Sequence, residues 1–160
     1  MVVTGIGAVT PLGGDVITSW KNLVKGLSGA QRISRFDPEG FPCRVACEVP
    51  IGEGISAKDG TFNPLDWFSN KDLKKVDDFM IFGVAAAEMA LKDSGLDLIS
   101  YNHNRVGVGI GSGVGGLPSI EKTSLILDKH GPRRVSPFFI PGALINLVAG
   151  HISIRNNLRG

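Results

Sequence analysis

Two segments of the chain share one pattern: a short apolar run, a cluster of glycines and then an amphipathic helix. The first begins with Val2 and Val3, and its glycines lead into a helix for which Asp15 is the expected N-cap. The second begins with Arg105–Ile110, and the glycine-rich residues 111–116 lead into a helix with a proline in its first turn. Strands that alternate with helices predict a layered α/β fold.

Other segments add helices but only one further candidate strand. Ser69, with Asp72 three residues later, resembles a capping box that opens a short helix. The further expected elements are a strand near Arg44–Val49, a helix from Asp78 to Ser94 that ends at Gly95, and a final helix from Gly142 to Leu158. The final helix is mostly apolar and needs a sheet to cover it. We therefore expect the 160 residues to be the first part of a larger domain.

Composition indicates a globular unit that does not insert into a membrane. Hydrophobic residues make up 42% and charged residues 20% of the chain. The longest uncharged apolar stretches, 79–87 and 137–150, are shorter than the ~20 residues that span a bilayer. The first residues lack the basic and apolar regions of a secretory signal. A cytoplasmic or organelle-matrix location is predicted.

The net charge is only +2, but basic residues are unevenly distributed. Residues 129–160 carry five basic side chains and no acidic one. Lysines at i, i+3 and i+4 are expected on one helix face, with Asp72 on another. The basic residues of interest are Lys71, Lys74, Lys75, Arg133 and Arg134. They indicate a docking patch for an acidic partner, the alternative being a solvated face. Nucleic acid is not expected, because no aromatic stacking platform accompanies the charge.

Residues 111–116 fit the pattern GxGxxG between an expected strand and an expected helix. Such a loop can hold a pyrophosphate at a helix N-terminus. The acidic residue that would contact a ribose after a following strand is missing, however, since Asp128 is followed by a turn. A structural turn is favoured, and dinucleotide binding remains an alternative.

No side chain in the sequence has the context of a catalytic nucleophile. Cys43 and Cys47 lack a second cysteine pair or a nearby histidine for zinc, and are expected to be small buried or half-buried hydrophobic residues. His151 lies among apolar residues of the final helix, where an imidazole could be a base but is more often a hydrogen-bonded core residue. Neither a catalytic residue nor a metal site is predicted.

Five motifs in register resemble the N-terminal part of the β-ketoacyl-acyl-carrier-protein synthase II family, the thiolase-like condensing enzymes. They occupy residues 2–13, 90–96, 109–116, 131–141 and 146–154. The match covers 1–160 as the N-terminal part of the synthase N-terminal domain and is loosest over 40–68. The resemblance implies an N-terminal portion of a thiolase-like layered α/β fold, incomplete without downstream sequence and lacking the C-terminal half.

The resemblance also implies an activity, partners and an assembly. Members are homodimers that elongate fatty acids, condensing an acyl thioester, held on a cysteine, with malonyl-acyl-carrier protein and releasing carbon dioxide. No cofactor is implied. The family's nucleophile lies downstream of its Arg-Gly-Pro, whereas this sequence stops at Arg159-Gly160. These 160 residues alone are therefore predicted to be inactive. The alternatives are a noncatalytic carrier-protein-binding fragment and a dinucleotide-binding oxidoreductase fragment.

The resemblance also implies roles for particular residues. Val114 matches a residue that lines the acyl-chain pocket, and Phe139 and Ile140 match residues where that pocket meets the dimer partner. The positions that match basic residues receiving the acidic acyl-carrier protein are Lys71, Lys74, Lys75, Arg133 and Arg134. The same basic residues thus stand out from composition and from the resemblance.

Overall fold

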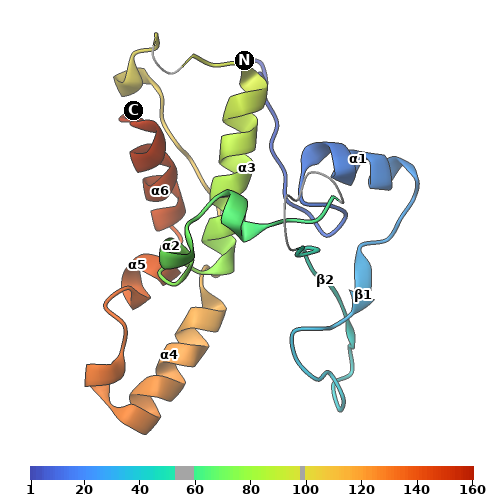
Figure 1. Ribbon diagram of the computed structural model, residues 1–160, viewed down its shortest axis with the longest axis vertical. Helices are drawn as coiled ribbons and strands as arrows, with labels where there is room; N and C mark the ends of the chain where they lie inside the picture. Colours follow the sequence, from blue (N-terminus) through green and yellow to red (C-terminus); the bar gives the residue numbers. More distant parts are fainter. Residues whose placement is uncertain (53–59, 98–99) are drawn as a thin grey trace.

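The computed structural model describes residues 1–52, 60–97 and 100–160, and its longest helix lies at the centre of the chain (Figure 1). This helix, α3 (Asp78–Ser94), packs beside α6 (Leu147–Asn156). Together with the loop before α3, the two helices bury a cluster of apolar side chains. Its members are Phe62, Phe68, Met80, Ile81, Val84, Ala85, Val148, Ile152 and Leu158. The core therefore lies mainly between helices.

The bounds of α3 agree with the sequence prediction, and the end residues explain why. Asp77 caps the helix because its Oδ1 accepts a hydrogen bond from the Asp78 amide at 2.7 Å. Gly95 ends it in the left-handed conformation, with φ of 65°. Within the helix, Gly83 lets α6 approach closely, because an added Cβ would lie 2.8 Å from Val148 Cγ1. The small side-chain positions of this helix therefore allow α6 to pack closely against it.

The N-terminal segment runs along α3 but is not the predicted buried strand. Val2 and Val3 are 82% and 81% exposed, and neither pairs in a ladder within the described residues. The next residues lie directly on the helix: the Ile6 amide donates to Asp93 Oδ2 at 2.8 Å, and any side chain at Gly7 would collide with the Ala86 carbonyl. This strand prediction is wrong for the structure, because a helix, not a partner strand, neighbours the segment.

The second predicted strand, 105–110, is also absent. Its first residue belongs to a short 3-10 helix, η3 (His103–Arg105), and Val106 to Ile110 follow without ladder pairing. A residue distant in sequence bonds to this stretch: the Gly160 amide donates a hydrogen bond to the Val106 carbonyl at 3.0 Å. Extended, apolar residues do not form a strand without the hydrogen bonds of a neighbour.

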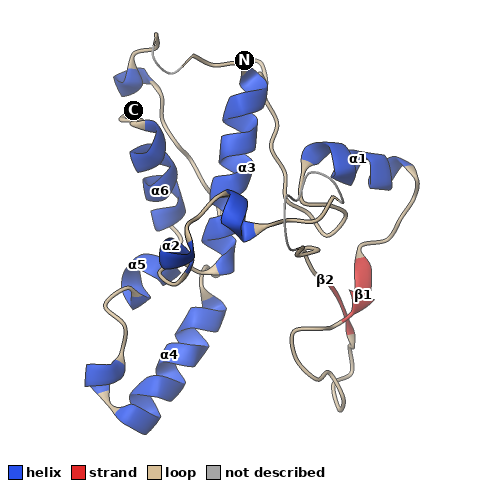
Figure 2. Cartoon of the chain, in the orientation of Figure 1, coloured by secondary structure: helices blue, strands red, loops and turns tan. Residues whose placement is uncertain are grey.

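The sheet of the described residues is small and lies to one side (Figure 2). Strands β1 (Ala30–Arg32) and β2 (Val45–Cys47) are antiparallel, with Ala30 opposite Cys47. β2 agrees with the strand expected near Arg44–Val49, whereas β1 has no sequence signal. Cys43 and Cys47 are both exposed, so the expectation that they are buried or half-buried is wrong. The reason is that residues on both faces of this small sheet are exposed, and that Cys43 lies in the exposed loop before β2.

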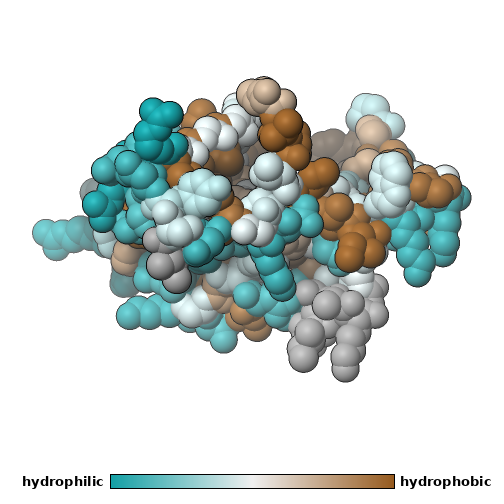
Figure 3. Space-filling view, turned by 90° about the horizontal axis from the view of Figure 1, so that it is seen from above, coloured by the Kyte–Doolittle hydropathy of each residue, from teal (hydrophilic) through white to brown (hydrophobic). Residues whose placement is uncertain are grey.

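Helix α1 (Val16–Val24) lies on the same side and presents apolar surface. Asp15 caps it as predicted, since its Oδ1 accepts from the Thr18 amide at 2.7 Å. Trp20 and Leu23 are 65% and 56% exposed. Seen from above, brown apolar surface alternates with teal hydrophilic surface on the molecule (Figure 3). The amphipathic face predicted for α1 exists but lacks a covering element among the described residues.

The C-terminal third contains three helices where two were expected. Helix α4 (Leu117–His130) projects from the core, and η4 (Pro132–Arg134) follows it (Figure 1). The predicted helix 142–158 is divided into α5 (Phe139–Ala143) and α6, because Leu144 has extended backbone with ψ of 135°. Two short helices, η2 (Pro64–Asp66) and α2 (Asn70–Leu73), precede α3. No helix of the described segments is long and apolar enough to cross a bilayer.

Candidate functional site

The lysines predicted as a patch follow from the short helix α2. Ser69 caps it as predicted: its hydroxyl accepts from the Asp72 amide at 3.2 Å and contacts Asp72 Oδ2 at 2.7 Å. Because α2 ends at Leu73, Lys74 is already its C-cap and Lys75 lies beyond it. Lys71 and Lys74 are exposed, whereas Lys75 is half-buried. The three lysines therefore do not share one face of a regular helix.

Lys75 is the basic residue that the structure turns inward. Its Nζ lies 2.6 Å from Asp72 Oδ1 and 5.5 Å from the centre of the Phe138 ring. The expectation that Asp72 lies on a different face is wrong, because the chain turns after Leu73 and brings the two side chains together. Hydrogen bonds from Lys75 and Ser69 lower the pKa of Asp72 from its ordinary value.

The second basic segment approaches the first across a surface hollow of about 260 Å³, here called the basic hollow. Arg134, from η4, lines it together with Lys74 and Lys75. Lys122, from α4, completes the set of cations, although the sequence analysis did not single it out. Lys71 and Arg133 are exposed but do not line the hollow. The structure thus brings together three of the five predicted docking residues.

A buried carboxylate fixes α4, and hence Lys122, relative to the lysines. Asp77 is 8% exposed, and its Oδ2 accepts from the Ser119 amide in the first turn of α4 at 3.0 Å. Its own amide donates to the Gly142 carbonyl of α5 at 3.2 Å. The side chain therefore satisfies amides at the N-termini of both α3 and α4.

This contact also bears on the alternative of dinucleotide binding. The glycine loop 111–116 is not preceded by a strand in the described residues, and the N-terminus of α4 already has Asp77 as its anion. A pyrophosphate would have to displace this carboxylate. The local structure gives the dinucleotide alternative no support.

The residues predicted to line an acyl pocket do not meet in one cavity of the described chain. Val114 is 65% exposed in the glycine loop, and Ile140 is 56% exposed on α5. Phe139 is half-buried and lines the basic hollow. Their role in an acyl pocket stays a prediction.

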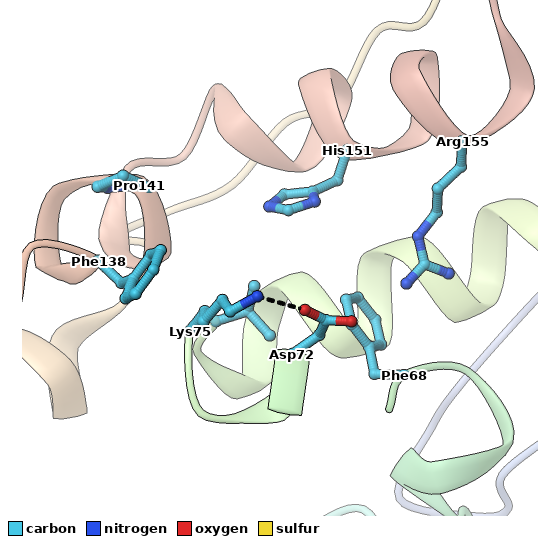
Figure 4. A pocket seen from close by; sticks show the side chains of 8 residues that line it. Phe68, Asp72, Lys75, Phe138, Pro141, His151 and Arg155 are labelled. Atoms are coloured by element: carbon cyan, nitrogen blue, oxygen red, sulfur yellow. Dashed lines mark hydrogen bonds and ion pairs between the residues drawn. The ribbon is translucent and has the colours of Figure 1, made fainter. Parts of the chain in front are cut away.

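A second cavity, of about 400 Å³, adjoins the basic hollow and shares Lys75, Val76 and Phe138 with it (Figure 4). We call it the His151 cavity. Figure 4 shows His151 and Arg155 reaching down from α6 toward Asp72 and Phe68. The Arg155 guanidinium lies 4.1 Å from the centre of the Phe68 ring and donates to the Trp67 carbonyl at 2.9 Å.

His151 is held near apolar and cationic groups, which disfavour its charged form. Burial lowers its pKa most, the Arg155 charge lowers it further, and Asp72 acts weakly in the opposite direction. Its ring packs edge-on to Phe68, with the centroids 6.5 Å apart. No cysteine or serine lines this cavity. His151 is thus half-buried at the wall of a cavity, and no hydrogen bond reaches its ring in the described residues, so the expectation of a hydrogen-bonded core residue is met only in its packing against Phe68.

Among residues 1–52, 60–97 and 100–160, no group of three histidine, cysteine or acidic side chains could hold a metal ion. The two cysteines lie in other surroundings: the Cys43 thiol interacts with the Val45 carbonyl at 3.3 Å, and Cys47 lines an open groove beside Trp20. The feature that stands out on the described surface is therefore the cluster of basic side chains around the basic hollow.

Comparison with known proteins identifies the class to which this fold and surface belong. The family description "Beta-ketoacyl synthase, N-terminal domain" matches residues 1–160. The chain belongs to the β-ketoacyl synthase family.

The curated relatives carry a more particular name. The chain is 47% identical to 3-oxoacyl-(acyl-carrier-protein) synthase 2 of Rhizobium meliloti (strain 1021), over 100% of this chain and 38% of that protein. It is 46% identical to the protein of the same name in Vibrio harveyi, over 100% of this chain and 36% of that one. The chain thus spans a little over a third of the length of these relatives.

Solved structures show the same fold. The ishigamide ketosynthase/chain length factor superposes with a TM-score of 0.79 at 27% identity, over 98% of this chain and 37% of that one. A ketosynthase bound to a hexaketide, in complex with its type II PKS acyl-carrier protein, gives a TM-score of 0.73 at 27% identity, over 99% and 39% of the two chains. The prediction of an N-terminal portion of a thiolase-like fold is confirmed.

Proposed function

We propose that this chain is the N-terminal segment of an enzyme that elongates fatty acids. The reaction would be the decarboxylative condensation of an acyl thioester with malonyl-acyl-carrier protein. In it the malonyl group loses carbon dioxide, the resulting carbanion forms a bond to the acyl carbonyl carbon, and the cysteine thiolate leaves. The names of the relatives support this proposal. The described residues would contribute binding surfaces to the reaction, and no nucleophile.

The observation that carries the proposal is the basic hollow. Lys74 and Arg134, sixty residues apart in sequence, line one hollow that has no carboxylate in its lining. A surface with one sign of charge raises the local concentration of an oppositely charged partner and speeds its encounter. An acyl-carrier protein, the acidic partner that the resemblance implies, fits this surface. A carrier protein also accompanies one of the similar ketosynthases.

The remaining predicted roles form part of the same proposal. Lys71 and Arg133 would extend the docking patch at the edge of the basic hollow, where both are exposed. Val114, Phe139 and Ile140 would contribute to the acyl pocket and to contacts within a homodimer. The exposure of Val114 and Ile140 supports this assignment, because large exposed apolar residues are commonly covered in assemblies.

Binding of acyl-carrier protein tests the docking proposal. The protein at its full expressed length is titrated with acyl-carrier protein at about 50 mM and 300 mM salt, a range over which screening of exposed charges increases. The double variant Lys74→Glu and Arg134→Glu is expected to bind much more weakly than the unmodified protein at low salt. The matched control reverses two exposed lysines at the C-terminal end of α1, Lys21→Glu and its C-cap Lys25→Glu, and is expected to bind normally.

Two outcomes would contradict the proposal. One is the absence of carrier binding at either salt concentration, and the other is an equal loss of binding in the α1 control. A separate assay addresses catalysis. The 160 residues alone are expected to give no elongated product from acyl and malonyl thioesters, and measurable turnover would show that they hold a nucleophile.

A further inference from the structure

The basic hollow is lined by more residues than the sequence analysis singled out. Its polar lining comes from three separate segments: the end of α2, the first turns of α4, and η4. The cationic members are Lys74, Lys75, Lys122 and Arg134, and the hydroxyls of Ser119 and Thr123 lie among them. The rings of Phe138 and Phe139 form an apolar wall.

The cations in this lining differ in whether they already form an ion pair within the protein. Lys75 forms an ion pair with Asp72 and is half-buried. Lys74, Lys122 and Arg134 are exposed, and in the described parts of the chain their side chains have neither an ion pair nor a hydrogen bond. Three uncompensated positive charges around one hollow repel one another, and an anion placed between them would relieve this repulsion.

The neighbouring carboxylates do not supply that anion. Asp72 is paired with Lys75, and Asp77 is buried with its two oxygens bonded to backbone amides. Glu121 precedes Lys122 on α4, and both line a neighbouring groove together with Lys129, but Glu121 is absent from the lining of the basic hollow. The hollow is therefore open to a negative group from another molecule.

We propose that the basic hollow is an anion subsite that takes a carboxylate side chain of the acyl-carrier protein, with Lys122 as a specificity-determining contact. This inference rests on the proposed function and adds a residue and a chemical group to it. A carboxylate suits the lining because its charge can meet Lys74, Lys122 and Arg134 while its methylene stem lies against the phenylalanine wall. Lys75, held by Asp72, shapes the hollow instead of binding.

Lys122 is suited to a clean test because the fold does not depend on it. Its side chain is exposed, and α4 is held to the core by other groups, chiefly the Asp77 contact with the Ser119 amide. Lys129 offers a matched control on the same helix. It lies seven residues later, about two turns away, and is absent from the lining of the basic hollow.

The experiment measures binding of acyl-carrier protein that lacks its phosphopantetheine group, so that carboxylates are the anions on offer. The protein at its full expressed length is compared with Lys122→Glu, Lys122→Arg and the control Lys129→Glu at about 50 mM salt. Lys122→Glu is expected to weaken binding roughly fivefold to tenfold, as a charge reversal in a docking surface does. Lys122→Arg is expected to bind normally, and Lys129→Glu to change binding by less than about twofold. Thermal melting checks that all variants are folded.

Each other outcome has a definite meaning. If Lys122→Glu and Lys129→Glu behave alike while the double variant at Lys74 and Arg134 still loses binding, the subsite is refuted and the docking proposal stands. If Lys122→Glu affects only carrier protein that bears phosphopantetheine, the occupant is a phosphate and the carboxylate assignment is overturned. If the unmodified protein binds neither form of the carrier, both the subsite and the docking proposal fail.

Discussion

Replacing Gly83 with alanine is expected to destabilise the protein, although alanine is the better helix former. Gly83 lies inside α3 where α6 crosses it, and an ideal Cβ at this position would lie 2.8 Å from Val148 Cγ1. Ordinary contacts between carbon atoms are ~3.5–4.0 Å, so the two helices or the valine would have to move. Val148 is 1% exposed, and a valine in a helix has one strongly preferred rotamer. The neighbour therefore cannot turn away easily.

The expected magnitude follows from two opposing effects. Replacing glycine by alanine in a helix interior stabilises by about 1 kcal/mol. Forcing an extra methyl group into a close-packed interface costs about 1–3 kcal/mol. We expect a net loss of about 1 kcal/mol in the free energy of unfolding, which lowers Tm by about 2–4 °C in a protein of this size.

Gly150 provides the matched control, because the same substitution is made in a helix with space around it. It lies inside α6, and an added Cβ would meet its nearest neighbour, Leu147 Cδ2, at 3.9 Å. Gly150→Ala is therefore expected to stabilise by about 0.5–1 kcal/mol. The two substitutions differ in the sign of their effect because of one packing distance.

A double-mutant cycle isolates the proposed collision. Val148→Ala alone removes buried methyl groups and is expected to cost about 2 kcal/mol. Combined with Gly83→Ala, it should cost clearly less than the two single losses added together, because the methyl group added at position 83 then fills the vacated space. Urea unfolding at equilibrium measures all four proteins. A Gly83→Ala variant more stable than the unmodified protein, or strictly additive losses, would refute this packing argument.

Two further predictions concern buried charge and pH. Asp77→Ala should lower the free energy of unfolding by about 2–3 kcal/mol, since it leaves part-buried amides of α3 and α4 without their acceptor. In thermal melting, a loss no larger than that of an exposed control on α4, Asp128→Ala, would contradict this role. His151 has a lowered pKa in the folded state, so the unfolded chain binds more protons as pH falls below 6.5 and stability decreases there. Tm measured from pH 7.5 to 5 should accordingly fall less steeply in His151→Gln than in the unmodified protein, and identical slopes would be inconsistent with a lowered pKa of this half-buried imidazole.

The sequence was sufficient wherever local chemistry determines local structure. Asp15 and Ser69 begin helices and Gly95 ends one, each through contacts with residues a few positions away, and all three agree with the sequence prediction. The strand prediction for Val2 and Val3 failed because strands depend on a partner segment, which local pattern does not specify.

The candidate site shows the same limit. The charges of Lys74 and Arg134 were visible in sequence, but their common hollow results from tertiary packing. Lys75 was assigned to the exposed patch because a regular helix was assumed to continue through it. Lys122 gave one usable signal, the absence of an acidic residue four positions on, where Ile126 stands. Its place in the hollow depends on the angle at which α4 leaves the core.

That angle is held by the Asp77 side chain together with the packing of α4 on α5, and this has a mechanical consequence. Asp77 joins the beginning of α3 to the first turn of α4, while its backbone amide is tied to α5. Helix α4 extends outward from this point, where the Gly116 amide at its start also donates to the Ala143 carbonyl of α5 at 3.0 Å (Figure 1). Any force that a bound molecule exerts on the outer turns of α4 is therefore transmitted to the interior through α5 and through Asp77, at the start of the helix that packs against α6.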